Sequence, residues 1–133
     1  DAIRSRGLGD VYKRQIQTSK SDYLLLDRFY DASVAYQGYG RNLSISFIES
    51  LISFINCPIP NLSILLDISV EEGFSRKTND QIDRIESSSK IFFQRIRKGY
   101  IKIAKDHKDR FIKINASMDI EEIHNEIINH INL

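Results

Sequence analysis

The sequence predicts an α/β domain in which helices flank a parallel sheet. Residues 62–68 form a nearly continuous apolar run, the pattern of a parallel strand covered on both faces, and residues 22–26 and 111–114 are two further short strands. Apolar residues recur at helical spacing in three segments that separate or follow these strands: 44–55, 87–107 and 120–131. Because strands and helices alternate along the chain, we expect parallel βαβ units joined by right-handed crossovers.

Composition limits the class of protein. At 133 residues and 41% hydrophobic, the chain is long enough for one domain with one core and too short for two. Its 19 Lys and Arg against 18 Asp and Glu give a net charge of +1, so we expect neither nucleic acid nor a membrane as a partner. Cys57 is the single cysteine, which leaves no disulfide and favours a reducing, cytoplasmic setting. No apolar run approaches the ~20 residues that cross a bilayer.

The N-terminal half begins irregularly. Residues 1–15 show neither helical nor strand periodicity, and we expect them to be unstructured. Residues 16–21 are expected to be a helix end and a loop, which lead into the strand at 22–26. Residues 39–42 are a turn-rich loop before the helix at 44–55. Pro58 and Pro60 end that helix, because proline has no N–H and restricts the residue before it.

The C-terminal half alternates between helix and strand. Ser69 and Glu72 have the spacing of a capping box, so we expect a helix that runs through Gly73 to about Lys77. The segment 76–81 is polar and turn-prone. The helix at 87–107 carries cations outside its apolar stripe, which we interpret as a solvated face: Arg95, Arg97, Lys98, Lys102 and Lys105.

Asp27 and Arg28 directly follow the first predicted strand. Ligands of open α/β sheets bind beyond the carboxyl ends of the strands, so these two side chains are expected at a ligand site. The planar fork of Arg28 matches a phosphate group bidentately, which a lysine cannot do. Asp27 has the chemistry to hold the water shell of a magnesium ion.

The residues after Asp27 identify a family. Asp27-Arg28-Phe29, followed by Asp31-x-Ser33-x-Ala35-Tyr36-Gln37-Gly38, resembles the motif of thymidylate kinases, and Asp83-Arg84-x-Glu86 resembles the box at the edge of their mobile lid. The similarity covers residues 16–133, and we expect residues 1–15 not to be native to the family. It implies the fold of the P-loop nucleoside-monophosphate kinases. Two positions depart from the family pattern, because Asn61 and Asn115 stand where the family has aspartate.

The resemblance implies transfer of the γ-phosphoryl group of ATP to thymidine monophosphate (dTMP), which gives dTDP, with Mg²⁺. It assigns catalytic roles to Asp27, Arg28 and Arg84. Arg28 is also expected to grip the acceptor phosphate, Ser33 to lie near the thymine, Tyr36 to pack against the sugar, and Gln37 to join them in binding substrate. The residues expected at ATP and in the lid are Arg76, Lys77, Arg84, Ala116 and Ser117. Family members are homodimers, so the complete enzyme is expected to be one.

These 133 residues contain no Gly-x-x-x-x-Gly-Lys-Ser/Thr motif, the loop that holds the β- and γ-phosphates of ATP. The chain therefore resembles the C-terminal part of the enzyme. In the family, the strand before that loop lies between the strand that ends at Asp27 and the strand that ends at Asp67. We therefore expect the 133 residues alone to fold poorly and to show no measurable phosphoryl transfer.

Two alternatives stay open. A deoxynucleoside kinase also has an Asp-Arg pair after a parallel strand, although the Ala35–Gly38 motif and the box at Asp83 favour a thymidylate kinase. The chain is alternatively a non-catalytic nucleotide-binding module without a P-loop.

Overall fold

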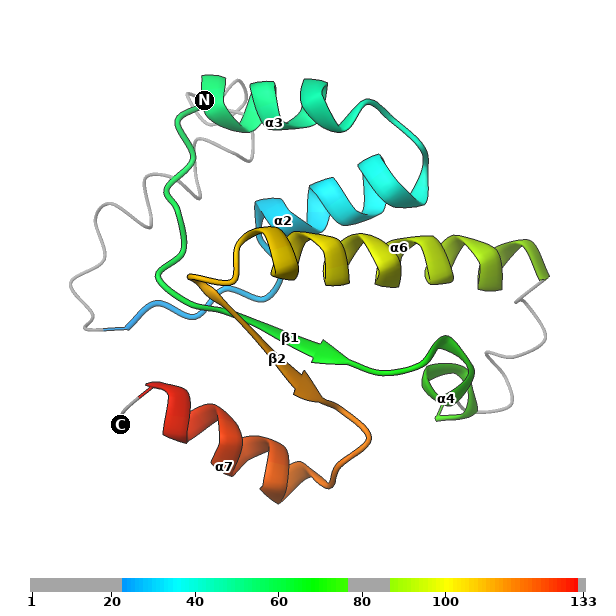
Figure 1. Cartoon of the computed structure of the whole chain (residues 1–133), viewed down its shortest axis with the longest axis vertical. Helices are drawn as coiled ribbons and strands as arrows, with labels where there is room; N and C mark the ends of the chain where they lie inside the picture. The colour runs from blue at the N-terminus through cyan, green and yellow to red at the C-terminus, as the bar shows by residue number, and fades with distance from the viewer. Residues whose placement is uncertain (1–22, 77–86, 132–133) are drawn as a thin grey trace, which may run out of the picture.

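The computed structural model describes residues 23–76 and 87–131, which form an α/β fold (Figure 1). In chain order its elements are α2 (Tyr30–Ser33), the π-helix η1 (Val34–Gly40), α3 (Ile45–Phe54), β1 (Ser63–Asp67), α4 (Val70–Ser75), α6 (Ser87–Asp106), β2 (Phe111–Asn115) and α7 (Ile120–Ile131). The two strands pair in parallel, with Ser63 opposite Phe111 and Asp67 opposite Asn115. The predicted class, helices around a parallel sheet, is therefore confirmed.

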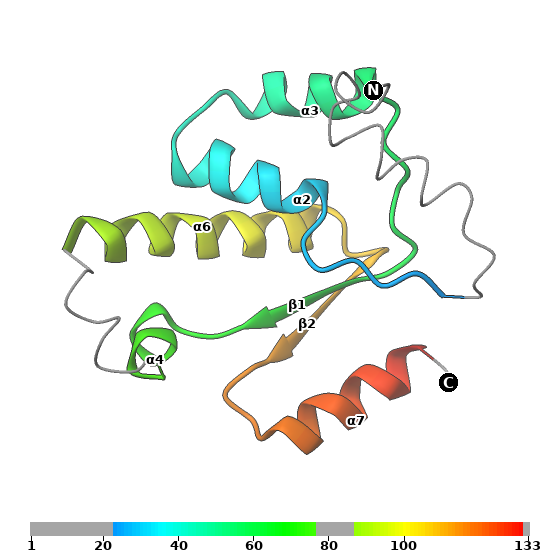
Figure 2. The ribbon, with the colours of Figure 1, turned by 180° about the vertical axis from the view of Figure 1, so that it is seen from behind.

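The helices lie on both sides of the two strands. Seen from opposite directions, α2, η1, α3 and α6 lie on one side of the strands and α7 on the other (Figures 1 and 2). The core lies where η1, α3 and α6 meet, and its buried members are Val34, Ala35, Ile48, Ile96 and Ile103. The best-packed part of the described structure is therefore the part that carries the Ala35–Gly38 motif.

Most of the predicted elements are present close to their expected bounds. The side chain of Ser44 caps α3, accepting a hydrogen bond from the backbone N of Phe47 at 3.3 Å. The side chain of Ser69 caps α4 in the same way, with the N of Glu72 at 3.1 Å. The helix that we expected to reach about Lys77 ends earlier, at Ser75.

The strand expected over residues 22–26 is wrong for the described residues 23–26, which have no regular secondary structure. These residues are exposed, and Leu25 is 91% exposed. A strand needs a hydrogen-bonded neighbour, and the sheet of the described residues contains only β1 and β2. An apolar run shows that a segment is suited to a buried strand. Whether it forms one depends on a neighbouring strand, which the run itself does not reveal.

The loop expected at 39–42 begins later, because η1 continues to Gly40. Close packing against α6 explains the two glycines at this contact. A Cβ atom on Gly40 would lie 2.8 Å from Cε2 of Phe92, and one on Gly99 would lie 2.6 Å from Cγ of Tyr39. π-Helical segments are rare and are often found at functional sites.

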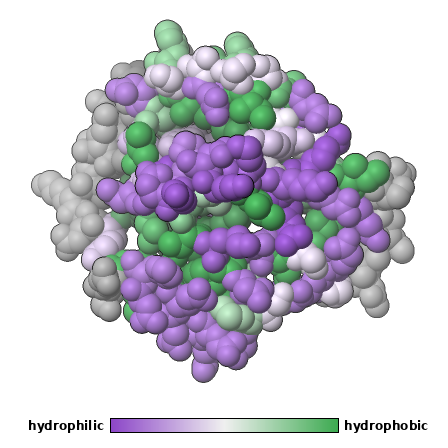
Figure 3. Space-filling view, viewed as in Figure 1, coloured by the Kyte–Doolittle hydropathy of each residue, from purple (hydrophilic) through white to green (hydrophobic). Residues whose placement is uncertain are grey.

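The surface of α6 is hydrophilic. In the space-filling view, a band of hydrophilic side chains crosses the middle of the face where α6 runs, with hydrophobic side chains on both sides of it (Figure 3). Lys98, Lys102 and Lys105 are exposed, as the solvated-face interpretation requires. The interpretation is wrong for Arg95, which is half-buried and whose Nε is buried without a hydrogen-bond partner among the described residues. Among the helices that the structure describes, none combines the length and the apolar character that a membrane span requires.

Candidate active site

The first site feature is the pair formed by Arg28 and Tyr36. Arg28 lies in the bend before α2 and has a positive φ of 60°, a conformation that is unfavourable for a residue with a side chain. Its Cζ atom lies 5.3 Å from the centroid of the Tyr36 ring, within the range of a cation–π contact. The bend thus holds the exposed guanidinium group over a fixed aromatic ring.

Tyr36 also packs edge-on against two rings of α6. Its ring centroid lies 6.3 Å from those of both Phe92 and Tyr100. Burial raises the pKa of the Tyr100 phenol to about 12, and the neighbouring Tyr36 adds to the rise while Arg28 opposes it. Tyr100 therefore stays protonated at neutral pH. The sequence placed Tyr100 only in the apolar stripe of a helix, although a buried tyrosine still carries a polar group.

The other predicted acceptor residues lie near this pair along the chain. Ser33 is the exposed last residue of α2, and Gln37 is half-buried in η1. Asp27 is exposed next to Arg28. The structure thus places these residues on one continuous segment, which packs against α6.

A pocket of about 240 Å³ lies between the end of β1 and α6. Tyr100 lines it together with Asp67 and Arg97. Arg97 donates from Nε to Oδ1 of Asp67 at 2.7 Å and from Nη2 to Oδ2 at 3.2 Å, and Lys113 lies 3.7 Å from the same carboxylate. The hydrogen bonds from Arg97 lower the pKa of Asp67, and the charges of Arg97 and Lys113 also lower it, against the opposing effect of burial.

This contact corrects the interpretation of one cation. We expected Arg97 to belong to a solvated helix face, but it binds Asp67 at the end of β1. The pair is 30 residues apart in the sequence, so no local pattern could have revealed it.

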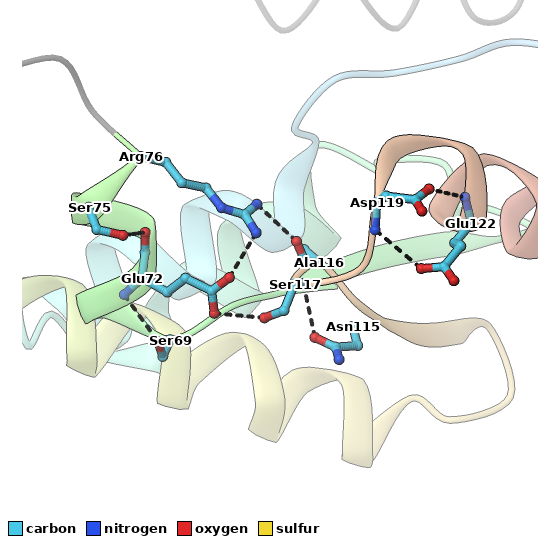
Figure 4. A network of polar contacts seen from close by, with 9 residues as sticks. All are labelled: Ser69, Glu72, Ser75, Arg76, Asn115, Ala116, Ser117, Asp119 and Glu122. Atoms are coloured by element: carbon cyan, nitrogen blue, oxygen red, sulfur yellow. Dashed lines mark hydrogen bonds and ion pairs between the residues drawn. The ribbon is translucent and has the colours of Figure 1, made fainter.

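A second polar group joins α4 to the loop between β2 and α7 (Figure 4). Arg76 donates from Nη1 to the backbone oxygen of Ala116 at 2.9 Å and from Nη2 to Oε1 of Glu72 at 2.8 Å. The hydroxyl of Ser117 donates to Oε2 of Glu72 at 2.7 Å. Two residues predicted to lie at ATP, Arg76 and Ser117, are therefore joined by the carboxylate of Glu72, which was not predicted to belong to the site. The third, Ala116, is joined to them through Arg76.

The capping box expected at Ser69 is only half present for the same reason. Ser69 accepts from the N of Glu72, but the carboxylate of Glu72 points to Arg76 and Ser117. A reciprocal box occurs instead at the start of α7. There the N of Glu122 donates to Oδ1 of Asp119 at 2.9 Å, and the N of Asp119 donates to Oε2 of Glu122 at 3.3 Å (Figure 4).

A buried ion pair links the motif segment to the sheet. Arg110, directly before β2, binds both carboxylate oxygens of Asp31 in α2, at 2.8 and 2.9 Å. Arg110 stands 79 residues from Asp31, at the edge of a predicted strand, where a charged residue usually indicates solvent exposure. No local pattern around either residue indicates this pair.

Two predicted residues, Lys77 and Arg84, and the box 83–86 lie outside the described residues. In the described ranges 23–76 and 87–131, no group of three or more His, Cys, Asp or Glu side chains could hold a metal ion directly. The carboxylate of Asp67 forms ion pairs with Arg97 and Lys113, whereas Asp27 is exposed and makes no ion pair with a described residue.

Comparison with known proteins identifies similar sequences over nearly the whole chain. The family model described as thymidylate kinase matches residues 3–127. The thymidylate kinase of Kosmotoga olearia is 39% identical over 111 residues, which cover 82% of this chain and 53% of that protein. The thymidylate kinase of Chlorobium luteolum is 33% identical and covers 98% of this chain and 65% of that protein.

A solved structure agrees with these similarities. The crystal structure of thymidylate kinase from Ehrlichia chaffeensis matches with a TM-score of 0.58 and 28% identity, over 80% of this chain and 47% of that one. The chain thus spans about half to two thirds of the length of the proteins it matches.

Proposed function

The chain belongs to the thymidylate kinase family, and we propose that it is the acceptor-binding and lid part of an enzyme that phosphorylates dTMP with ATP in the cytoplasm. In this reaction an oxygen of the dTMP phosphate attacks the γ-phosphorus of ATP, the bond to the β–γ bridging oxygen breaks, and dTDP and ADP result. Mg²⁺ neutralises phosphate charge, and protein catalysis of this step is mainly positioning and charge stabilisation.

The observation that carries the proposal is the Arg28–Tyr36 pair. Arg28 is an exposed cation within a family motif, held over a ring by a strained backbone. A guanidinium group in this setting can grip the dTMP phosphate bidentately. The ring beneath it is then placed to pack against the sugar attached to that phosphate, with Ser33 and Gln37 on the same segment for the base.

The ATP side is proposed for the second polar group. Arg76 and the Ala116–Ser117 loop lie together, so they can contact the nucleotide from two elements. Lys77 and Arg84 complete the lid in this proposal, with Arg84 acting on the transferred group. Asp27, next to Arg28 in the chain, would hold Mg²⁺ through its water shell.

The residues that hold the β- and γ-phosphates in P-loop kinases have no counterpart in these 133 residues. We expected the 133 residues alone to fold poorly, but the buried core where η1, α3 and α6 meet favours a chain in which the acceptor segment is held in place. We therefore propose that this chain by itself binds dTMP, and that without the phosphate-holding loop it transfers no phosphoryl group. We also propose that the complete enzyme is a homodimer. The supporting observation is that α3 presents Phe47, Leu51 and Phe54 as exposed apolar side chains, which a second subunit could cover. Sedimentation equilibrium measures the oligomeric state.

Calorimetric titration of the chain with dTMP and with thymidine tests the proposed function. A thymidylate kinase binds its acceptor through a phosphate, so dTMP should bind at least about tenfold more tightly than thymidine. Tighter binding of thymidine would support the deoxynucleoside kinase alternative. If neither dTMP nor thymidine binds, both the thymidylate kinase and the deoxynucleoside kinase hypotheses are contradicted.

A further inference from the structure

Arg110 occupies an unusual position between the sheet and the motif segment. It precedes β2, and its backbone oxygen accepts a hydrogen bond from the N of Ser63 at 2.7 Å. Its Nη1 atom also donates to the hydroxyl of Ser63 at 3.0 Å. Arg110 is thus bound to the start of β1 through both its backbone and its side chain.

The same guanidinium group is bound to α2. Nη1 donates to Oδ2 of Asp31 at 2.9 Å and Nη2 to Oδ1 at 2.8 Å, a bidentate fork with both residues less than 10% exposed. The rings of Tyr30 and Phe111 lie near the guanidinium, with centroids 5.5 and 4.7 Å from Cζ. The hydrogen bonds that Arg110 donates to Asp31 raise the pKa of Arg110 against the opposing effect of burial, so the guanidinium stays protonated.

A buried ion pair of this kind is weak evidence for stability alone. Removing two charges from water costs several kcal/mol per ion, and apolar residues of similar volume often stabilise a fold as well or better. The bidentate geometry, by contrast, fixes direction, because the two parallel hydrogen bonds allow only one orientation of the carboxylate. Such a pair is therefore suited to setting the position of one element relative to another.

The element that depends on this pair is α2. It continues without a break into η1, but its N-terminus, next to Arg28, has no side-chain cap. Arg28 lies three residues before Asp31, and Ser33 lies two residues after it. Among the described residues, the Asp31–Arg110 pair is the only side-chain ion pair made by α2.

We propose that Arg110 is a positioning residue for the acceptor subsite, acting through Asp31 to fix where Arg28 and Ser33 stand relative to the sheet. Arg110 does not touch the substrate. This inference rests on the proposed function, because it assumes that Arg28 and Ser33 bind dTMP.

Two variants separate positioning from stability. Arg110→Lys keeps the charge but loses the planar fork. The double variant Asp31→Leu/Arg110→Met replaces the pair with apolar side chains, which can preserve stability without the directional contact. The matched control is Lys102→Met/Asp106→Leu, which removes an exposed ion pair within α6 in the same way.

Each variant is measured by thermal unfolding and by calorimetric titration with dTMP. We expect the apolar double variant to keep a Tm close to that of the unaltered chain and to bind dTMP at least about tenfold more weakly, since small misplacements of binding groups have large effects. Arg110→Lys should weaken dTMP binding in the same direction, and it decides the question if the double variant does not fold. The control should leave dTMP binding unchanged.

The outcomes distinguish this inference from the proposed function. If the unaltered chain binds dTMP and both variants bind it equally well, Arg110 is structural only and the inference is wrong, while the proposed function stands. If the unaltered chain does not bind dTMP, the proposed function fails and the inference fails with it.

Discussion

The guanidinium group of Arg28 lies 5.3 Å from the centroid of the Tyr36 ring, and the two residues belong to one motif in which an arginine precedes a tyrosine by eight positions. The ring is itself held edge-on by Phe92 and Tyr100. A change at either Arg28 or Tyr36 therefore alters the surroundings of the other. Variants of the ring must be compared with a phenylalanine variant that keeps the cation–π contact.

Tyr36→Ala should reduce discrimination between deoxyribonucleotides and ribonucleotides. The ring is expected to exclude a 2′-hydroxyl sterically, and removing a steric filter admits the larger ligand. The measurement is the ratio of Kd values for dTMP and the corresponding ribonucleotide. Tyr36→Phe should keep the ratio of the unaltered chain. An unchanged ratio in Tyr36→Ala would show that the ring only packs against α6.

The glycine at the contact between η1 and α6 gives a stability prediction. Gly99→Ala should lower the free energy of unfolding by about 1–3 kcal/mol, because the new Cβ would lie 2.6 Å from Cγ of Tyr39. The matched control is Gly73→Ala in α4, where the nearest atom is 3.7 Å away. It should stabilise the chain by about 0.5–1 kcal/mol through helix propensity. Urea unfolding measures both, and a stabilising Gly99→Ala would contradict the packing described here.

The Asp67–Arg97 pair predicts a pH dependence. The pKa of Asp67 is lowered in the folded state, so the contribution of the pair is present above the ordinary Asp pKa of about 3.9 and is lost as the pH falls through the lower folded value. Arg97→Gln should reduce the free energy of unfolding by about 1 kcal/mol at neutral pH, a modest value because solvent around the partly exposed Arg97 weakens the ion pair. In acid, where Asp67 is protonated, the variant and the unaltered chain should have the same free energy of unfolding.

The control for this prediction is Lys102→Gln. Lys102 pairs with Asp106 on the exposed side of α6, so its loss should have little effect at any pH. Unfolding in urea across the acid range gives both comparisons. A difference for Arg97→Gln that is the same in acid and at neutral pH would show that Asp67 does not carry the effect.

Local patterns predicted much of this fold. The helices α3, α6 and α7, the strands β1 and β2, and the Ser69 cap follow from spacing within a few residues. Other features depend on partners far away in the sequence. The strand expected at 22–26 has no neighbour among the described residues, and Arg110 finds Asp31 across 79 positions.

The residues of the candidate site likewise fall into those that local spacing predicts and those that it does not. The motif identified Arg28, Ser33, Tyr36 and Gln37, because their spacing is local and specific. The residues that hold the motif in place were missed. Tyr100 and Arg110 lie far from the motif in the sequence, and only folding brings them to Tyr36 and Asp31. Arg97 was missed in the same way, although it binds Asp67 and not the motif. Glu72 was assigned to a helix cap, because the spacing could not show that its carboxylate turns to Arg76 and Ser117.

The most direct test of the account is calorimetric titration of dTMP and thymidine into the unaltered chain, Arg28→Lys and Arg41→Lys. If Arg28 grips the phosphate, Arg28→Lys should weaken dTMP binding by about 1.5–3 kcal/mol, roughly tenfold to a hundredfold in Kd, and leave thymidine binding unchanged. Arg41, an exposed arginine just after η1, should tolerate the same change. Equal dTMP affinity in all three proteins, or equal losses for dTMP and thymidine in Arg28→Lys, would contradict the assignment of Arg28 to the acceptor phosphate.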